Sequence, residues 1–164
     1  MADYATLGEF TKALDNAYKG LDKAVEVALR RDVKDLVGRI KLRVSGTGKK
    51  ADGGSFSTPY SKSHTYKRKK YGSGSLGKQV GYKGFFYQGD MWNNFRMLNL
   101  VNSGNRINAT LGFEGNNMYK TNDELNEIHS KREGIKIAAP NSDEAKEFTR
   151  KIGFSIGEYL KSVL

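Results

Sequence analysis

Cysteine is absent from this chain of 164 residues, and so is any long apolar run. Without cysteine the protein can form neither a disulfide framework nor a thiolate metal site, which fits an intracellular origin. No stretch approaches the roughly 20 consecutive apolar residues that cross a bilayer, and no basic region followed by an apolar run opens the chain. We therefore expect no export signal and no membrane partner.

Acidic residues are nearly absent from residues 45–84. This stretch holds nine Lys and Arg residues and one acid, Asp52, so it carries +8 of the formal net charge of +10. It is rich in Gly and Ser and poor in branched aliphatic residues, so it cannot bury enough apolar surface to offset the entropy of ordering. We expect a basic arm that stays mobile or folds against a partner, either an anion or a second copy of the chain.

The rest of the chain has the composition of one globular body. Its 19 bases (28 − 9) face 17 acids (18 − 1), and hydrophobic residues make up 37% of the whole chain, which suffices for one modest core. We expect a single domain over residues 1–164. It comprises an N-terminal helix in residues 1–44, the arm in residues 45–84, and a hairpin sheet with two helices in residues 85–164.

Apolar residues recur at intervals of three and four from Leu7 to Ile40, which predicts one long amphipathic helix. The helix should end near Ser45, where two closely spaced glycines supply a stop signal. A glycine inside a helix costs about 1 kcal/mol relative to alanine, so a kink or break is expected near Gly20 or Gly38.

Two alternating runs after the arm predict an antiparallel hairpin. Residues 102–105, Asn-Ser-Gly-Asn, separate the runs and include a glycine that tolerates positive φ. A further strand is expected over residues 82–87. Phe95, Met97 and Val101 should lie on one face of the first run. One face of the second run should carry Ile107, Ala109, Leu111 and Phe113.

Two capping boxes predict the last two helices. Thr121 with Glu124, and Asn141 with Glu144, have the spacing at which two side chains satisfy free amides of a first helical turn. The first helix should run to about residue 130. The second should carry an apolar stripe made of Ala145, Phe148, Ile152, Ile156, Tyr159, Leu160 and Val163.

Between these helices, residues 134–139 have the composition of a brief strand, closed by Pro140. The predicted class is therefore α+β. The long N-terminal helix and the C-terminal helix should pack on a small antiparallel sheet, with an extended basic arm.

Two glycine-rich stretches of the arm resemble the sequence motifs of nucleotide-binding loops, but neither fits such a loop fully. Residues 72–77 read Gly-x-Gly-x-x-Gly, but a Lys-Arg-Lys-Lys-Tyr run precedes them instead of a buried strand, and no helix follows. Residues 46–50 carry Lys50 where a phosphate-binding loop needs a magnesium-binding hydroxyl. We expect no cofactor.

One cluster keeps an enzymatic interpretation open. Glu124, Glu127 and His129 lie close together on the predicted short helix, where carboxylates and an imidazole could do acid–base work or hold a metal. Residues 127 and 129 project about 200° apart on a helix, however, so a solvated helix face is the favoured interpretation. We expect a protein that is not an enzyme.

The basic residues of the arm are the stronger functional candidates, with a solvated loop as the alternative. Lys and Arg would release counterions on meeting phosphates, while Phe56, Tyr66 or Tyr71 could stack on bases or pack in a protein groove. The predicted nucleic-acid-binding or partner-binding residues are Lys49, Lys50, Lys62, Lys67, Arg68, Lys69, Lys70 and Lys78.

The order of the segments carries a resemblance. After the long helix come Thr-Pro-Tyr-Ser at residues 58–61 and Thr-Tyr-Lys-Arg-Lys at residues 65–69. Residues 87–95, Tyr-Gln-Gly-Asp-Met-Trp-Asn-Asn-Phe, then lead into the hairpin and the two capped helices. Together these segments resemble the neck and tail-completion proteins of tailed bacteriophages.

In that family a glycine, a leucine and a later apolar residue precede the central hairpin. Gly89, Met91 and Phe95 lie near those places, and residues 126–129 followed by 138–141 resemble a second family element after the hairpin. Three residues depart from the family pattern of threonine, a polar residue and serine: Gln88, Trp92 and Asn94.

The resemblance implies a structural subunit that forms a homo-oligomeric ring in the virion neck, assembled in the host cytoplasm. Its partners would be portal, connector or tail proteins and the packaged double-stranded DNA that passes through the ring. Trp92 and Phe95 lie outside the most regular elements, so we predict them at the assembly interface together with Tyr66 and Tyr71. The alternative is a standalone, non-sequence-specific nucleic-acid-binding protein that uses the basic arm.

Overall fold

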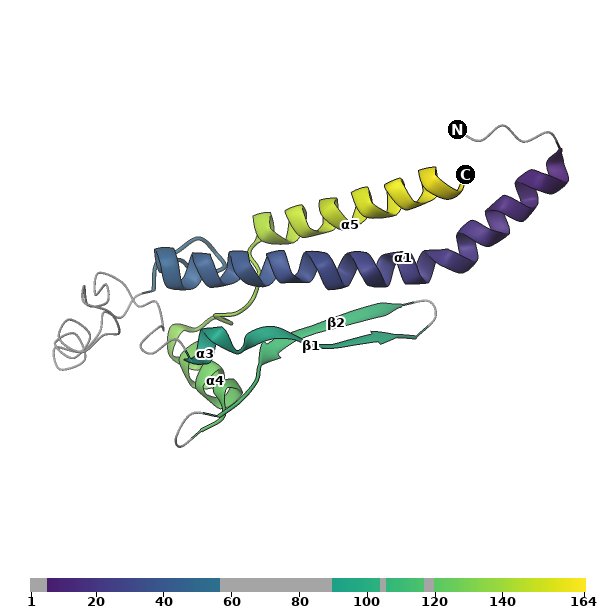
Figure 1. The fold of residues 1–164 in the computed structure, drawn as a ribbon. Coiled ribbons are helices and arrows are strands. Elements are labelled where there is room, and N and C mark those ends of the chain that lie inside the picture. The colour runs from purple at the N-terminus through teal and green to yellow at the C-terminus, as the bar shows by residue number, and fades with distance from the viewer. Residues whose placement is uncertain (1–5, 57–89, 104–105, 117–119) are drawn as a thin grey trace, which may run out of the picture.

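The computed structural model describes residues 6–56, 90–103, 106–116 and 120–164 (Figure 1). It confirms the predicted α+β class, because a long N-terminal helix and a C-terminal helix accompany an antiparallel sheet of two strands in the described residues. The strand predicted over residues 82–87 lies outside them. The elements are α1 (Leu7–Lys41), a π-helical turn η1 (Leu42–Thr47), α3 (Asp90–Asn93), β1 (Phe95–Asn102), β2 (Ile107–Phe113), α4 (Asn122–Glu133) and α5 (Ser142–Val163).

The first helix begins and ends at local signals. The Thr6 hydroxyl accepts a hydrogen bond from the Glu9 amide at 3.2 Å, and the Glu9 carboxylate accepts one from the Thr6 amide at 3.0 Å, a capping box that was not predicted. After η1, Gly48 has a φ of 65°, which glycine adopts without a Cβ clash. α1 runs unbroken through Gly20 and Gly38, although Figure 1 shows it bent in its N-terminal part (purple).

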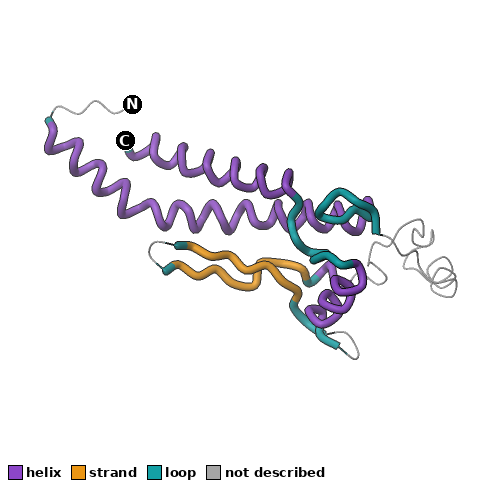
Figure 2. Tube along the Cα trace, turned by 180° about the vertical axis from the view of Figure 1, so that it is seen from behind, coloured by secondary structure: helices purple, strands orange, loops and turns teal. Residues whose placement is uncertain are grey.

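α1 is the central layer of the molecule. In Figures 1 and 2, α5 runs antiparallel along one side of α1, and the β1–β2 hairpin lies along the other side. α3 and α4 gather at one end of the hairpin, near the C-terminal end of α1. α5 therefore packs mainly on α1, and it contributes Phe148 to the edge of the core that α1 shares with the hairpin.

Side-chain pairs set the register between the two long helices. Three of them are Arg31 with Ser155 (2.5 Å), Asp35 with Lys151 (2.8 Å), and Arg39 with Glu147 (4.0 Å). In each of these three pairs the residue numbers add up to 186. Nearer its C-terminal end, α5 reaches further along α1, because the Tyr159 hydroxyl donates to the Ala17 carbonyl at 3.1 Å and Ala17 is 3% exposed. We call residues 7–18, about three turns, the overhang, and α5 covers only its inner end. Figures 1 and 2 show this end of α1 projecting past the hairpin as well.

The hairpin has the predicted strands but contains a bulge. Register shifts between Met97 and Asn99, so Leu98 has no partner residue on β2. Beyond the bulge Leu100 pairs with Ala109, and Val101 is turned to the other face, where it is 45% exposed. The prediction that Val101 shares a face with Phe95 and Met97 is therefore wrong, because one extra residue reverses the alternation of side chains.

Trp92 and Phe95 belong to the core of the single chain. Each is 1% exposed, and the Trp92 ring meets the Phe95 and Phe113 rings edge-on at centroid distances of 5.6 and 5.4 Å. The single turn of α3 folds Trp92 back over the start of the hairpin, so these side chains are covered without a partner. This burial corrects their prediction as interface residues. The cluster comprises Val33, Leu36, Val37, Ile40, Val44, Phe56, Met91, Trp92, Phe95, Phe113 and Ile137.

Both predicted capping boxes are confirmed, and each begins its helix. The strand predicted over residues 134–139 is wrong, because these residues form a turn after α4, which extends to Glu133. The Ile135 amide donates to the Ser130 carbonyl, and the Ile137 amide donates to the Ser130 hydroxyl. These bonds close the turn locally, and they bury Ile137 in the core at 1% exposure.

Candidate functional site

The predicted arm begins later than its composition suggests. Lys49 and Ser55 form an antiparallel bridge, and the Phe56 amide donates to the Gly48 carbonyl at 3.2 Å. Phe56 is 7% exposed and lies in the core cluster. Residues 45–56 therefore belong to the folded body, because one aromatic side chain and two glycines with positive φ, Gly48 and Gly53, hold a tight reversal there.

The two ends of the arm enter the body at the same place. Phe56, the last described residue before it, and Met91, just after it, belong to one core cluster, and Met91 is 8% exposed. Most of the predicted binding residues lie outside the described residues, so the structure does not place them. These are Lys62, Tyr66, Lys67, Arg68, Lys69, Lys70, Tyr71 and Lys78.

Of the two predicted binding lysines that are described, one is already engaged. The Lys50 ammonium donates to the Glu133 carbonyl at 3.2 Å and lies 3.8 Å from the Glu133 carboxylate, and its side chain is 15% exposed. This corrects the prediction for Lys50, because its charge is used inside the chain. Lys49 remains exposed, with its ammonium donating to the Ser55 hydroxyl at 3.2 Å.

A buried ion pair stabilises this region of the body. Arg43 Nε donates to Glu144 at 2.9 Å, and both side chains are 8% exposed. The other guanidinium nitrogens donate to the carbonyls of Lys49 at 2.9 Å and Ala139 at 2.6 Å. The groove beside this pair, about 700 Å³, is lined by acids as well as bases, so it offers a polyanion no uniform charge.

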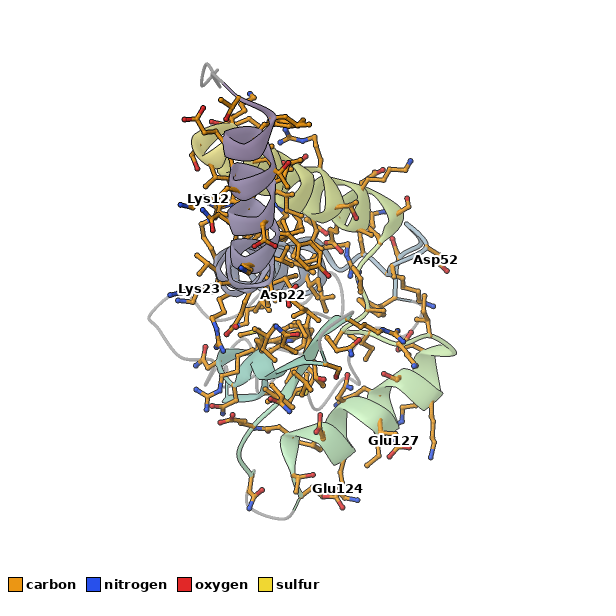
Figure 3. All side chains as sticks on the ribbon, turned by 90° about the vertical axis from the view of Figure 1, so that its right-hand side faces the viewer. Lys12, Asp22, Lys23, Asp52, Glu124 and Glu127 are labelled. Atoms are coloured by element: carbon orange, nitrogen blue, oxygen red, sulfur yellow. The ribbon has the colours of Figure 1, made fainter. Side chains whose placement is uncertain are left out.

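The carboxylates of α4 have structural partners. The Thr121 amide and hydroxyl donate to Glu124, and these hydrogen bonds lower the pKa of that carboxyl. Glu127 lies 3.5 Å from Lys131, and Figure 3 shows Glu124 and Glu127 pointing outward from α4. Within the described ranges, no group of three or more His, Asp or Glu side chains is placed to hold a metal ion.

A basic stripe, not predicted from the sequence, runs along α1. Five basic residues follow Lys12 at offsets of 7, 11, 18, 22 and 29. At about 100° per residue these offsets keep the stripe within a sector of roughly 60°, over a length of about 44 Å. Attention to helical periodicity among the bases would have found it. The stripe comprises Lys12, Lys19, Lys23, Arg30, Lys34 and Lys41.

Part of the charge of the stripe is uncompensated. Lys19 pairs with Asp15 at 2.5 Å and Arg30 pairs with Glu26 at 2.8 Å, whereas the other four bases make no ion pair with another described residue. Figure 3 shows Lys12 and Lys23 on one side of α1 and Asp22 on a different side. Partial burial lowers the pKa of Lys41. The other five bases are exposed and span about 33 Å from Lys12 to Lys34, and such a row of cations suits an extended polyanion.

The overhang exposes large apolar side chains. Leu7 is 80% exposed, Phe10 40%, Leu14 43% and Tyr18 76%. Leu14 follows Lys12 by two residues, so the apolar face points about 200° away from the basic stripe. An exposed apolar row of this kind is typical of a protein interaction site.

In the part of the chain that is described, no helix is long and apolar enough to cross a membrane. Comparison of the whole chain with known protein families, with curated proteins and with solved structures finds no match.

Proposed function

We propose that this protein is a structural subunit of the neck of a tailed bacteriophage, where copies of the chain form a ring that joins the portal to the tail. The subunit would act without a cofactor, through its surfaces. The proposal rests on the resemblance in segment order, and one structural observation carries it further. That observation is the exposed apolar face of the overhang.

In a single copy of the chain, the overhang leaves large apolar side chains exposed to water. Leu7 and Tyr18 remain about four-fifths and three-quarters exposed, so these two side chains gain little burial energy in the monomer. Its capping box nevertheless fixes where it begins. A subunit that completes its burial by assembly accounts for both features, since apolar area removed from water contributes roughly 25 cal/mol per Å².

The charges of the subunit agree with a place beside DNA. The basic stripe and the apolar face lie on nearly opposite sides of α1, so one side could face a neighbouring subunit while the other faces the packaged duplex. The part of the arm after Phe56, residues 57–84, holds seven bases and no acid, so it would add seven positive net charges to either surface.

The test is the assembly state of the full chain. Native mass spectrometry and negative-stain electron microscopy should show a closed ring with a channel wide enough for duplex DNA. Addition of purified portal rings of the same phage should give a complex with the two rings stacked on one axis. A protein that remains monomeric at high concentration and does not bind the portal ring would overturn the proposal.

A standalone nucleic-acid-binding protein is the second candidate, and the basic stripe favours it. Such a protein should bind duplex DNA as a monomer without sequence preference, because phosphate contacts carry no base information. Replacing Lys12, Lys23 and Lys34 by Gln should reduce the slope of log K against log salt by up to about 3, at 0.9 per phosphate contact.

The matched control for that triple variant is replacement of Lys131, Lys136 and Lys146 by Gln. These three exposed lysines lie on α4, its following turn and α5, so the change in net charge is the same. If both triple variants weaken DNA binding equally, the affinity depends on the net charge of the protein and not on the stripe. Binding by the monomer alone, with no ring under any condition, would favour the second candidate over the first.

A further inference from the structure

Three lysines of the basic stripe are evenly spaced along α1. Lys12, Lys23 and Lys34 follow one another at intervals of 11 residues, and each is exposed without an ion pair to another described residue. Eleven residues are close to three full helical turns, so the three side chains leave α1 in nearly the same direction, at intervals of about 16.5 Å. Figure 3 shows Lys12 and Lys23 on the same side of α1, so the bend of the helix does not turn Lys12 away.

This interval matches the surface of a DNA duplex. A line drawn along a duplex, parallel to its axis, crosses each phosphate backbone once in every helical turn of about 34 Å. Successive crossings belong to alternate strands and are therefore about 17 Å apart on average. The crossings are unevenly spaced, because the major groove, about 12 Å wide, is wider than the minor groove, about 6 Å wide. The flexible stem of a lysine side chain takes up that difference.

The aromatic residues of α1 favour a duplex over a single strand as the partner. Single strands are held largely by stacking of their bases on aromatic side chains. The two aromatic residues of α1 are Phe10, 40% exposed, and Tyr18, 76% exposed. Both project about 120–160° away from the line of lysines. A single strand on that line would find no aromatic ring of α1 to stack on, whereas a duplex needs none.

The acidic residues nearest the line are engaged with other groups. Asp15 lies 2.5 Å from Lys19, and Glu26 lies 2.8 Å from Arg30. The Glu9 carboxylate accepts an amide in the capping box that begins α1. The acids beside the stripe therefore offset its two paired bases, and they leave the charge of the three evenly spaced lysines available to phosphates.

We propose that α1 lies along a DNA duplex, parallel to its axis. Lys12 and Lys34 contact one strand, one helical turn apart, and Lys23 contacts the other strand. This inference deepens the proposed function and rests on it for packaged duplex DNA as the natural partner, so α1 would run along the channel of the ring. Because these contacts go to phosphates alone, duplexes of any sequence are held equally.

Moving one cation around the helix tests the line without a change in net charge. Lys23→Gln with Tyr18→Lys shifts one cation by about 140° around α1, to a position whose natural side chain is 76% exposed. Binding to a duplex of about 24 base pairs is followed by fluorescence anisotropy between 50 and 200 mM salt, and the slope of log K against log salt should fall by about 0.9 in magnitude. An unchanged slope would overturn the proposal.

The matched control for this variant is Lys146→Gln with Tyr18→Lys. Lys146 is an exposed residue of α5 outside the stripe, so this variant has the same new lysine and the same net charge. It should keep the natural slope. The arm is identical in all three proteins, so its own contacts with DNA cancel in the comparison. Equal losses in the two variants would show that the line of lysines has no special part in binding.

Cysteine cross-linking tests the orientation, because the natural chain contains no cysteine. The full chain with Lys12→Cys and Lys34→Cys is mixed at low salt with duplexes that carry two thiol tethers on phosphates of one strand. Tethers about 10 base pairs apart, one helical turn, should give the doubly cross-linked product at least tenfold faster than tethers about 5 base pairs apart, which lie on opposite sides of the duplex. Each single-cysteine variant should react equally with both duplexes. Equal double cross-linking at the two spacings would overturn the parallel orientation.

The outcomes separate this inference from the proposed function. Rings that close and bind the portal, while the moved lysine leaves the salt slope unchanged, would refute the duplex contact of α1 and leave the neck function standing. A monomer that binds duplex through the line of lysines and forms no ring would support the contact and refute the neck function. Tighter binding to phosphatidylserine vesicles than to duplex, lost in the same variant, would assign the lysines to a membrane surface and overturn the proposal.

Discussion

Arg43 Nε lies 2.9 Å from Glu144 Oε1, and the two residues stand 101 positions apart with both side chains nearly inaccessible to water. Glu144 at the same time accepts the Asn141 amide at 2.8 Å as part of the α5 capping box. One carboxylate therefore begins α5 and fixes it to η1. Removal of one member of such a pair leaves the other charge buried without compensation.

Arg43→Met should consequently destabilise the protein by about 3–5 kcal/mol, as measured by urea unfolding followed by circular dichroism. Glu144→Gln should cost less, because its amide oxygen can still accept a hydrogen bond while the charge is removed. The double variant should be more stable than the sum of the two single effects predicts. A loss below about 1 kcal/mol for Arg43→Met would mean that the pair is solvated.

Trp92→Ala should lower the free energy of unfolding by about 3–5 kcal/mol, since it opens a cavity in the core. Trp92 Nε1 makes no hydrogen bond with another described residue, so Trp92→Phe should lose packing alone and cost less. Both are measured on the monomer at low concentration. A variant of normal monomer stability that fails to assemble would instead place Trp92 at an interface.

Gly20→Ala should destabilise the protein by about 1–2 kcal/mol, although alanine favours helix. A Cβ at Gly20 would lie 2.0 Å from the Tyr159 hydroxyl, which donates to the Ala17 carbonyl at 3.1 Å. Thermal unfolding measures the effect. In a Tyr159→Phe background the same substitution should cost less, because the obstructing hydroxyl is gone.

Gly38→Ala is the matched control for that experiment. Gly38 also lies within α1, but nothing stands within 4 Å of the position where its Cβ would lie. This substitution should stabilise the protein by up to about 1 kcal/mol through helix propensity. Equal effects at the two glycines would refute the close approach of Tyr159 to α1.

The contact between α1 and α5 should weaken in acid. Hydrogen bonds from Lys151 and then Arg39 lower the pKa of Asp35 in the folded protein. A lowered folded pKa contributes stability that is present above the unfolded value, near 4, and is lost as the pH falls through the folded value. Between pH 6 and pH 3, Asp35→Asn should therefore lose less of its urea midpoint than the natural protein does.

Asp22→Asn serves as the control, because Asp22 makes no ion pair with another described residue. It should follow the natural acid dependence closely. An unchanged pH profile for Asp35→Asn would show that the Asp35 pairs contribute nothing to folding in solution.

The features that could be read from the sequence depend on neighbours within one or two helical turns. The boxes at Thr121 and Asn141 join residues three positions apart, so a short pattern suffices to predict where α4 and α5 begin. The hairpin was predicted in the same way, from the alternation of apolar and polar residues on both sides of a glycine-containing loop. The bulge at Leu98 was missed, because one unpaired residue leaves no mark in the composition of a strand.

The sequence by itself determined the order of α1, the hairpin, α4 and α5, the starts of α4 and α5, and the class of the fold, since each arises from local propensity and periodicity. Tertiary structure alone decided that Trp92 is core, that Lys50 is held by Glu133 83 residues away, and that α5 ends before the overhang does. Those outcomes depend on which distant surfaces meet and where each helix stops along its neighbour. No pattern within a few residues records such a register, so the exposed apolar side chains of the overhang became visible only in the folded chain.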